Sequence, residues 1–172
     1  GLTIFDLKKS IGKHSTFADS IVSGQTSILE CVPDPVQKNM IWLYKADGLY
    51  SYDTKNEVSK KWHSFGYSID ELNRSLKTLC VTPKGTIYTA AKNNGLVELL
   101  PASGKVTLYP FSKNVTTAYS SNNINSLLNA DTTHIMVATQ ESGLALFDVQ
   151  TKKFEFLTQN NFPESDFFRF QA

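Results

Sequence analysis

Short runs of apolar residues alternate with turn residues along the whole chain, and this pattern predicts β-strands. The runs hold four to six residues rich in Ile, Val, Leu, Thr, Tyr and Phe, and segments such as Pro33-Asp34 and Pro83-Lys84-Gly85 separate them. Such runs between turn residues are typical of strands. One segment is helical in character instead. Ser68 and Glu71 have the spacing of a capping box, which predicts a short helix over 68–74.

The dipeptide Gly-Leu recurs along the chain at intervals of 47, 47 and 48 residues. Each copy opens an apolar run that is followed by a turn and a second run, as in GLYSYDTKNEVSKKWHSF. Two further runs precede each of the last three copies, as in SLKTLCV and TIYTAA. A period of this length with four runs predicts repeats of four antiparallel strands. The third strand of each repeat is expected to begin at the dipeptide, whose copies are Gly1-Leu2, Gly48-Leu49, Gly95-Leu96 and Gly143-Leu144.

Glycine and aspartate recur at fixed places in this repeat. A tight turn before the third strand often needs a residue with positive φ, which glycine adopts at no steric cost. Asp6, Asp53 and Asp148 follow the third strand and start the next turn, whereas the third repeat has Leu100-Pro101. A short carboxylate at such a place can accept hydrogen bonds from nearby backbone N–H groups.

Both faces of the third strand are apolar. The leucine of each dipeptide points to one face, and an apolar side chain three residues later points to the other: Phe5, Tyr52, Leu99 and Phe147. A four-stranded sheet covered on both faces, repeated with a period in the forties, is expected of blades arranged around an axis. A β-sandwich is the competing architecture, but its strands usually show no long-period repeat.

The predicted fold is therefore all-β, a β-propeller fragment of about three and a half four-stranded antiparallel blades. Residues 1–172 are expected to form a single partial propeller. Its repeat units and tail are placed approximately at 1–20, 21–67, 68–115, 116–160 and 161–172.

The composition is that of a soluble globular protein, with 41% apolar residues, 19% charged residues and a net charge of +1. Lysines are scattered and no basic stripe occurs, so nucleic acid is not an expected partner. No apolar run has the length of a membrane span, and no membrane insertion of this segment is expected. The chain starts at Gly1 within a repeat, so any leader is expected upstream.

No catalytic residue, metal site or cofactor is predicted. The sequence has no Gly-x-Ser-x-Gly elbow, His-Glu-x-x-His motif, phosphate-binding glycine loop or Cys-x-x-Cys pair. His14, His63 and His134 fall at places in the repeat that are not equivalent. Cys31 and Cys80 are expected to be buried free thiols, with a disulfide or a metal site as alternatives.

The segment NNINSLLNADTTHIMVATQESGLALFDVQTKKFEF has Ser-Leu in its first strand, an Ile-led second strand, and then Gly-Leu with an aromatic residue and Asp. It resembles the two-component regulator propeller repeat of periplasmic sensor regions in hybrid two-component systems of polysaccharide-degrading bacteria. The resemblance covers essentially the whole chain. In that family the second strand often reads Leu-Trp-Ile-Gly-Thr. Here only Ile41-Trp42 keeps the tryptophan, while Tyr88 and Met136 replace it elsewhere.

The resemblance implies a non-enzymatic sensor segment in the periplasm, belonging to an inner-membrane protein. An oligosaccharide would be the ligand, and the signal would pass through the membrane to a histidine kinase that this chain does not contain. Two alternatives stay open. One is a propeller scaffold that binds protein partners, and the other is a propeller enzyme such as a polysaccharide lyase or a dehydrogenase.

The expected binding residues lie in loops. Loops between the second and third strands and loops between repeats emerge at the same face of a propeller, where amides and carboxylates can bond sugar hydroxyls and tyrosines can stack. The candidates are Tyr67, Asn93, Asn94, Tyr119, Gln140 and Glu141. Trp42 and Trp62 could also stack a sugar ring, but their places in strands favour packing.

The two ends of the chain predict self-association. The first repeat holds only its third and fourth strands, and the segment starting at Phe167 resembles the start of another strand. Seven blades of this period would need roughly 330 residues. Uncovered blade faces and strand edges are expected to pair with a second copy or with the remainder of a parent propeller. The rival outcome is a closed ring of four blades.

Overall fold

The computed structural model describes residues 2–6, 8–15, 28–45, 48–62, 78–91, 95–110, 124–140 and 143–157. These residues form one two-stranded hairpin and three four-stranded sheets. The hairpin pairs β1 (Leu2–Asp6) with β2 (Ile11–Ser15). Blade I consists of β3 (Ile28–Pro33), β4 (Met40–Lys45), β5 (Gly48–Asp53) and β6 (Val58–Trp62).

The other two blades repeat this plan. Blade II consists of β7 (Leu79–Val81), β8 (Ile87–Ala91), β9 (Gly95–Leu100) and β10 (Lys105–Tyr109). Blade III consists of β11 (Ile124–Asn129), β12 (His134–Thr139), β13 (Leu144–Asp148) and β14 (Lys153–Phe156). Each sheet lies within one predicted repeat unit, while the limits predicted for the units lie outside the described residues.

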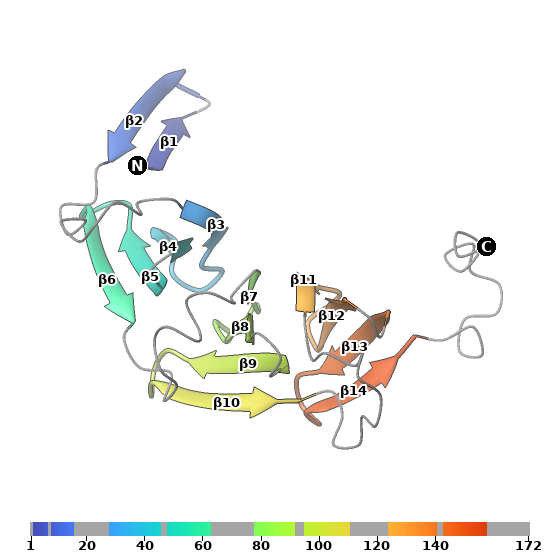
Figure 1. The fold of residues 1–172 in the computed structure, drawn as a ribbon. Coiled ribbons are helices and arrows are strands. Elements are labelled where there is room, and N and C mark those ends of the chain that lie inside the picture. The colour runs from blue at the N-terminus through green and yellow to red at the C-terminus, as the bar shows by residue number, and fades with distance from the viewer. Residues whose placement is uncertain are drawn as a thin grey trace.

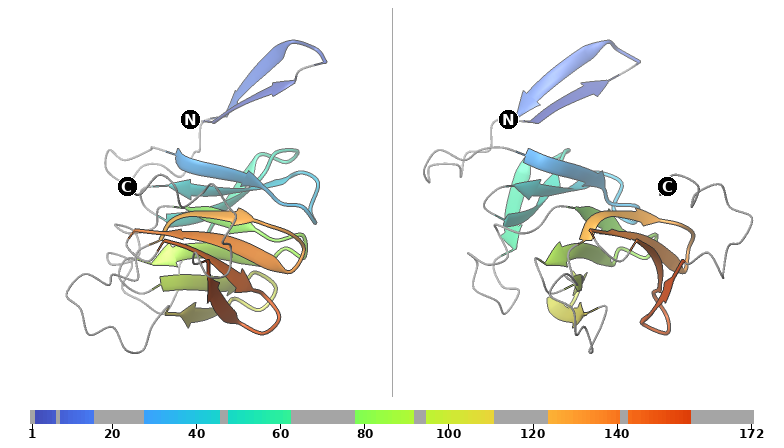
Figure 2. Two further views of the ribbon diagram at one scale, coloured as in Figure 1. Left: turned by 90° about the vertical axis from the view of Figure 1, so that its right-hand side faces the viewer. Right: turned by 45° about the vertical axis from the view of Figure 1, so that its right-hand side comes forward.

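Within each blade, consecutive strands pair antiparallel in chain order. Figure 1 shows the hairpin and the three blades following one another along an arc, with β3, β7 and β11 on the inner side and β6, β10 and β14 on the outer side. The two views in Figure 2 show the hairpin beyond blade I, at the end of the arc. The register shift in β3 between Ile28 and Glu30 recurs in β11 between Ile124 and Ser126. The same irregularity thus bends the innermost strand in two blades.

The described residues contain no helix, and the expected helix over 68–74 lies outside them. The part of the chain that the structure describes accordingly has no helix with the length and hydropathy needed to cross a membrane.

The third strand of each blade begins where the Gly-Leu period places it. β5 starts at Gly48 and β9 at Gly95, and β13 starts one residue after Gly143. Gly95 has a φ of +94° and Gly143 a φ of +76°, a backbone region that side-chain-bearing residues rarely adopt. The predicted need for positive φ before this strand is confirmed at both positions.

The apolar core lies between neighbouring blades. Trp42 and Leu49 of blade I pack with Leu79, Ile87 and Leu99 of blade II. A second cluster joins blades II and III and includes Tyr88, Leu96, Ile135, Val137 and Phe147. Leu96 and Leu99 of the same strand thus belong to different clusters, one on each side of blade II. The predicted burial of both faces is confirmed.

Aspartates order the turns between the third and fourth strands. Asp53 Oδ1 accepts hydrogen bonds from the backbone N–H groups of Lys55 and Asn56 at 2.8 and 3.1 Å, and Asp148 has the equivalent bonds at 2.7 and 3.0 Å. Blade II has Leu100 there, and its turn is closed by a bond from the N–H of Gly104 to the carbonyl of Leu100 at 2.8 Å. The predicted role of the aspartates is confirmed at both positions.

Each of these turns also contains one residue with positive φ, at the same place in every repeat. These residues are Ser10, Glu57, Gly104 and Lys152, with φ values of +52°, +60°, +66° and +60°. Three of the four carry side chains, so this turn accepts an ordinary residue at that place. The side chain found there differs between the blades, and this difference shapes the space between them.

The hairpin β1–β2 is tied to blade I by charge. Lys13 of β2 forms an ion pair with Glu57, in the turn between β5 and β6. Both side chains are exposed, so this pair adds little to stability.

The structure corrects the expectation for the cysteines. Both are free, but Cys31 is exposed and only Cys80 is buried. Cys31 falls on the exposed positions of β3, where exposure alternates from residue to residue. Cys80 lies in β7, which is buried along its whole length, and burial raises the pKa of its thiol to about 11.

Large apolar side chains are exposed at five described positions, on different elements: Ile11, Leu29, Val36, Val58 and Leu128. They are spread over the hairpin, blade I and blade III. Self-association stays a prediction.

Candidate functional site

Because consecutive strands run antiparallel, the turns between the first and second strands and between the third and fourth strands lie at the same end of every blade. A groove of about 460 Å³ opens at this end between blades I and II. Trp42, Ser51 and Trp62 of blade I form part of its lining, together with Leu100 and Pro101 of blade II. Both turns and strands therefore shape it.

Two indole rings meet in the groove. The ring centroids of Trp42 and Trp62 are 5.4 Å apart, with planes inclined at 48°. Trp42 is fully buried and its Nε1–H donates to Asp34 Oδ2 at 2.9 Å, whereas Trp62 is half-buried and its Nε1–H donates to Ser51 Oγ at 3.1 Å. Trp42 thus packs in the core, as its strand position predicts, while Trp62 offers a partly accessible aromatic surface.

The carboxylate oxygens of Asp34 are hydrogen-bonded within blade I. Its Oδ1 accepts hydrogen bonds from the N–H groups of Val36 and Gln37 at 2.8 and 2.9 Å, and its Oδ2 accepts the bond from Trp42. The side chain is 7% exposed. Asp34 therefore orders the turn beside the groove and has little capacity left for a ligand.

Two lysines supply the positive charge of the groove. The Lys60 ammonium lies 4.1 Å from the centroid of the Trp62 ring, a cation–π contact. Lys84 lines the opposite wall, in the turn between β7 and β8. Both residues are exposed, and no described carboxylate forms an ion pair with either.

The equivalent place between blades II and III is almost filled. The space that remains there is about 90 Å³. Glu98, which is 5% exposed, accepts hydrogen bonds from the hydroxyls of Tyr88 at 2.5 Å and Tyr109 at 2.9 Å. Lys152 of blade III reaches across, forms an ion pair with Glu98 and lies 3.1 Å from the Tyr88 hydroxyl.

Strand register shows which residues correspond at these two places. In blade I, Ser51 of the third strand pairs with Trp42 and Lys60. In blade II, Glu98 of the third strand pairs with Tyr88 and Thr107. Ser51 and Glu98 therefore occupy equivalent positions. Trp62 and Tyr109 also correspond, because they pair with Leu49 and Leu96. In the adjoining turns, Gly104 corresponds to Lys152.

The groove between blades I and II is therefore open because two positions carry small residues. Serine replaces the glutamate, and glycine replaces the lysine that would reach across from the next blade. The sequence period carries this signal, because aligning the repeats places Ser51 at the position of Glu98 and Gly104 at the position of Lys152.

The charged cluster between blades II and III has shifted pKa values. Burial raises the pKa of Glu98, but hydrogen bonds from Lys152, Tyr88 and Tyr109 outweigh it and leave the pKa below its usual value. Burial and the bond to Glu98 raise the pKa of Tyr109 to about 12. Glu98 is therefore ionised and both tyrosines are protonated at neutral pH.

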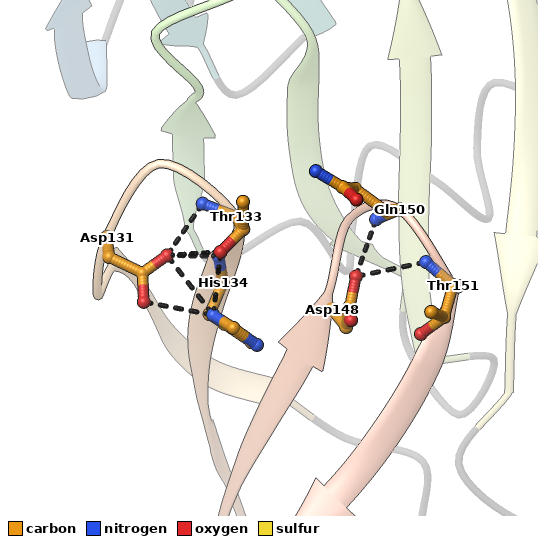
Figure 3. Close-up of polar contacts among 6 residues, drawn as sticks. All are labelled: Asp131, Thr133, His134, Asp148, Gln150 and Thr151. Atoms are coloured by element: carbon orange, nitrogen blue, oxygen red, sulfur yellow. Dashed lines mark hydrogen bonds and ion pairs between the residues drawn. The ribbon is translucent and has the colours of Figure 1, made fainter.

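Figure 3 shows two turns of blade III side by side. Asp131 Oδ1 accepts hydrogen bonds from the N–H groups of Thr133 and His134 at 2.6 and 2.8 Å, and the His134 ring lies 2.9 Å from Asp131 Oδ2. Asp148 Oδ1 accepts hydrogen bonds from the N–H groups of Gln150 and Thr151. These bonds lower the pKa of both carboxyl groups.

The turn carboxylates make stability depend on pH. Because their pKa values are lower in the folded chain, they contribute stability above their unfolded pKa of about 4, and this stability is lost as the pH falls. We expect Asp131→Asn to flatten the fall in melting temperature between neutral and acidic pH, since Asn can still accept the turn bonds. Thermal melts against pH measure this, with Glu155→Gln as the charge-matched control. Curves of equal slope for wild type and Asp131→Asn would contradict it.

The candidate loop residues lie at the other end of the blades or outside the described residues. Gln140 is exposed and directly follows β12, at the end opposite the groove. Tyr67, Asn93, Asn94, Tyr119 and Glu141 lie outside the described residues. The structure thus does not test that site, and the groove is a second candidate that sequence reasoning missed.

The described residues contain no group of three His, Cys, Asp or Glu side chains placed to hold a metal ion. His14 lies in β2 and His134 starts β12, at different places in their blades. His63 lies outside the described residues.

Solved structures with similar folds cover most of the chain. The extracellular domain assigned to the hybrid two-component system BT4673 from B. thetaiotaomicron matches with a TM-score of 0.61 and 19% identity over 88% of this chain. The corresponding domain of BT3049 from the same organism matches with a TM-score of 0.58 and 19% identity over 86%. The WD40 repeats of RRP9 match with a TM-score of 0.56 and 11% identity over 77%.

The chain has a β-propeller fold. WD40 repeats form propeller blades, and the three four-stranded sheets follow their plan, which confirms the predicted fold class. The propeller segment spans 19% of the BT4673 domain, 20% of the BT3049 domain and 38% of the RRP9 chain. No protein-family profile matches the sequence, and no curated protein shows significant similarity to it.

Proposed function

We propose that this propeller segment is a non-enzymatic, ligand-binding part of a periplasmic sensor in a two-component system, and that its ligand is an oligosaccharide. The observation that carries the proposal is the fold shared over 86–88% of the chain with extracellular domains of hybrid two-component systems. The repeat resemblance of residues 122–156 points the same way. A histidine kinase in the same parent protein belongs to this proposal.

The groove between blades I and II supports a ligand-binding role. Its volume lies within the range of small-molecule sites, and its lining combines aromatic and aliphatic surface with a few polar groups. The apolar C–H face of a sugar ring packs well on an aromatic side chain such as Trp62, while hydroxyls bond amides such as Gln37.

The groove offers little for bond cleavage. Of the described residues that line it, Asp34 is the one carboxylate, and its oxygens are engaged by Val36, Gln37 and Trp42. Hydrolysis of a glycosidic bond usually needs two carboxyl groups facing the bond. A binding role therefore fits this geometry better than a glycoside hydrolase.

Calorimetric titration of the chain with neutral and acidic oligosaccharides tests the proposal. Saturable binding of at least one saccharide is expected. Trp62 should report it through fluorescence, because Trp42, the other of the two tryptophans, is buried away from solvent. Trp62→Leu should weaken binding, and Lys153→Gln, on the exposed outer strand of blade III, should leave it unchanged.

Binding of a protein partner with no response to any saccharide would contradict the proposal and favour the scaffold alternative. Turnover of a polysaccharide by the chain would contradict the non-enzymatic part.

A further inference from the structure

We propose that the groove between blades I and II binds the carboxylate of an acidic sugar, a hexuronate unit, through Lys60 and Lys84. This inference rests on the proposed function and names its ligand class. The space between blades II and III is filled by charged groups of the protein, whereas the space between blades I and II is open.

Between blades II and III, a carboxylate meets an ammonium group beside aromatic rings. Glu98 accepts the Lys152 ion pair, and the Lys152 ammonium lies 5.7 and 5.8 Å from the ring centroids of Tyr88 and Tyr109. Glu98 and Lys152 thus neutralise each other inside the protein. The remaining space is about 90 Å³, which leaves no room for a sugar.

Between blades I and II, the ammonium and the aromatic rings are present, but no carboxylate stands at the position of Glu98. The Asp34 carboxylate, which also lines this groove, is engaged by Val36, Gln37 and Trp42. Lys60 supplies the cation beside Trp62, and it pairs in register with Ser51, the residue that replaces Glu98. Lys84 adds a second cation on the facing wall. No described carboxylate pairs with either lysine, so an external carboxylate can take the place that Glu98 occupies in the next interface.

The volume of the groove and its apolar wall in blade II indicate that the external carboxylate is carried by a sugar ring. The volume of about 460 Å³ exceeds the needs of a carboxylate alone. Leu100 and Pro101 form an apolar wall that suits the C–H face of a sugar ring, and Thr86 and Gln37 offer polar groups for hydroxyls. An acidic peptide side chain would satisfy the lysines but would leave this wall and these polar groups largely unused.

Matched oligosaccharides test the inference. Galacturonate oligomers and neutral galactose oligomers of equal length are titrated into the chain, followed by calorimetry and Trp62 fluorescence. The acidic oligomer should bind at least about tenfold more tightly, since a charge-assisted hydrogen bond contributes about that factor. Lys60→Gln and Lys84→Gln should each remove most of this preference, whereas Lys153→Gln should keep it.

A double variant tests the site by filling it. Ser51→Glu with Gly104→Lys places in this groove the pair that Glu98 and Lys152 form next door, and Gly104 already has the φ of Lys152 with nothing within 4 Å of an added Cβ. The variant should fold and should lose galacturonate binding. Retained binding in the folded variant would overturn the groove as the site.

The other outcomes are equally decisive. Equal affinity for both oligomers, unaffected by the lysine substitutions, would overturn the acidic-sugar inference and leave the saccharide sensor standing. Tighter binding of an oligoglutamate peptide than of galacturonate would overturn the assignment to a sugar. Binding of no saccharide of any kind would overturn the proposed function as well.

Discussion

Gly95→Ala is expected to destabilise the protein by about 3 kcal/mol, and Gly95→Val by more. Gly95 has a φ of +94°, where an L side chain is strained by about 1–2 kcal/mol. A Cβ built on this residue would lie 2.5 Å from the carbonyl oxygen of Tyr109 and 3.0 Å from Cα of Pro110. Both atoms belong to the backbone, so relief requires β10 to shift, and such overpacking costs about another 1–3 kcal/mol.

Gly143→Ala is the matched control for this substitution. Gly143 occupies the same place in blade III with a φ of +76°, but an added Cβ there would meet nothing within 4 Å. Only the strain of positive φ should remain, about 1 kcal/mol. Urea denaturation of the two variants measures the difference. If both variants lost the same free energy of unfolding, the contact between β10 and an added Cβ at Gly95 would not be destabilising, which would contradict the prediction.

Glu98→Ala is expected to destabilise the protein by about 2 kcal/mol or more, because it removes one carboxylate that three groups share. Tyr88 and Tyr109 lose their hydrogen bonds, and the Lys152 ammonium loses its counter-charge. Breaking a buried ion pair by removing one member costs about 3–5 kcal/mol. The side chain of Lys152 is 35% exposed, so water screens part of the charge and the expected loss is smaller.

A double-mutant cycle separates the ion pair from the packing. Lys152→Met alone should also destabilise the fold, because Glu98 is left as a buried charge. The double variant Glu98→Ala with Lys152→Met should lose less than the sum of the two single losses. Ser51→Ala is the matched control in blade I, since it removes only the bond from Trp62 and should cost about 1 kcal/mol. Additive losses would contradict a coupled pair.

The all-β fold and its strand boundaries could be predicted because they depend on local chemistry. Alternation of apolar side chains along a strand is a property of neighbouring residues, and the turn chemistry of Gly95 or Asp53 depends on a few bonds within one turn. The repeat makes these local patterns easier to recognise, because the strand and turn pattern occurs in four copies. Burial on both faces of β9 followed from the same pattern, because Leu96 and Leu99 are both apolar.

The sequence by itself determined the blades, but only the tertiary structure decided what lies between them. Whether an inter-blade space is open depends on side chains from two blades meeting across it, as Lys152 meets Glu98. Ser51 and Gly104 look unremarkable in their own strand and turn, and together they leave the groove beside Trp62. Cys31 is a similar case, because its exposure depends on how its strand faces the neighbouring elements. Local pattern sets each surface of a blade, and packing between blades determines which part of that surface remains accessible to a ligand.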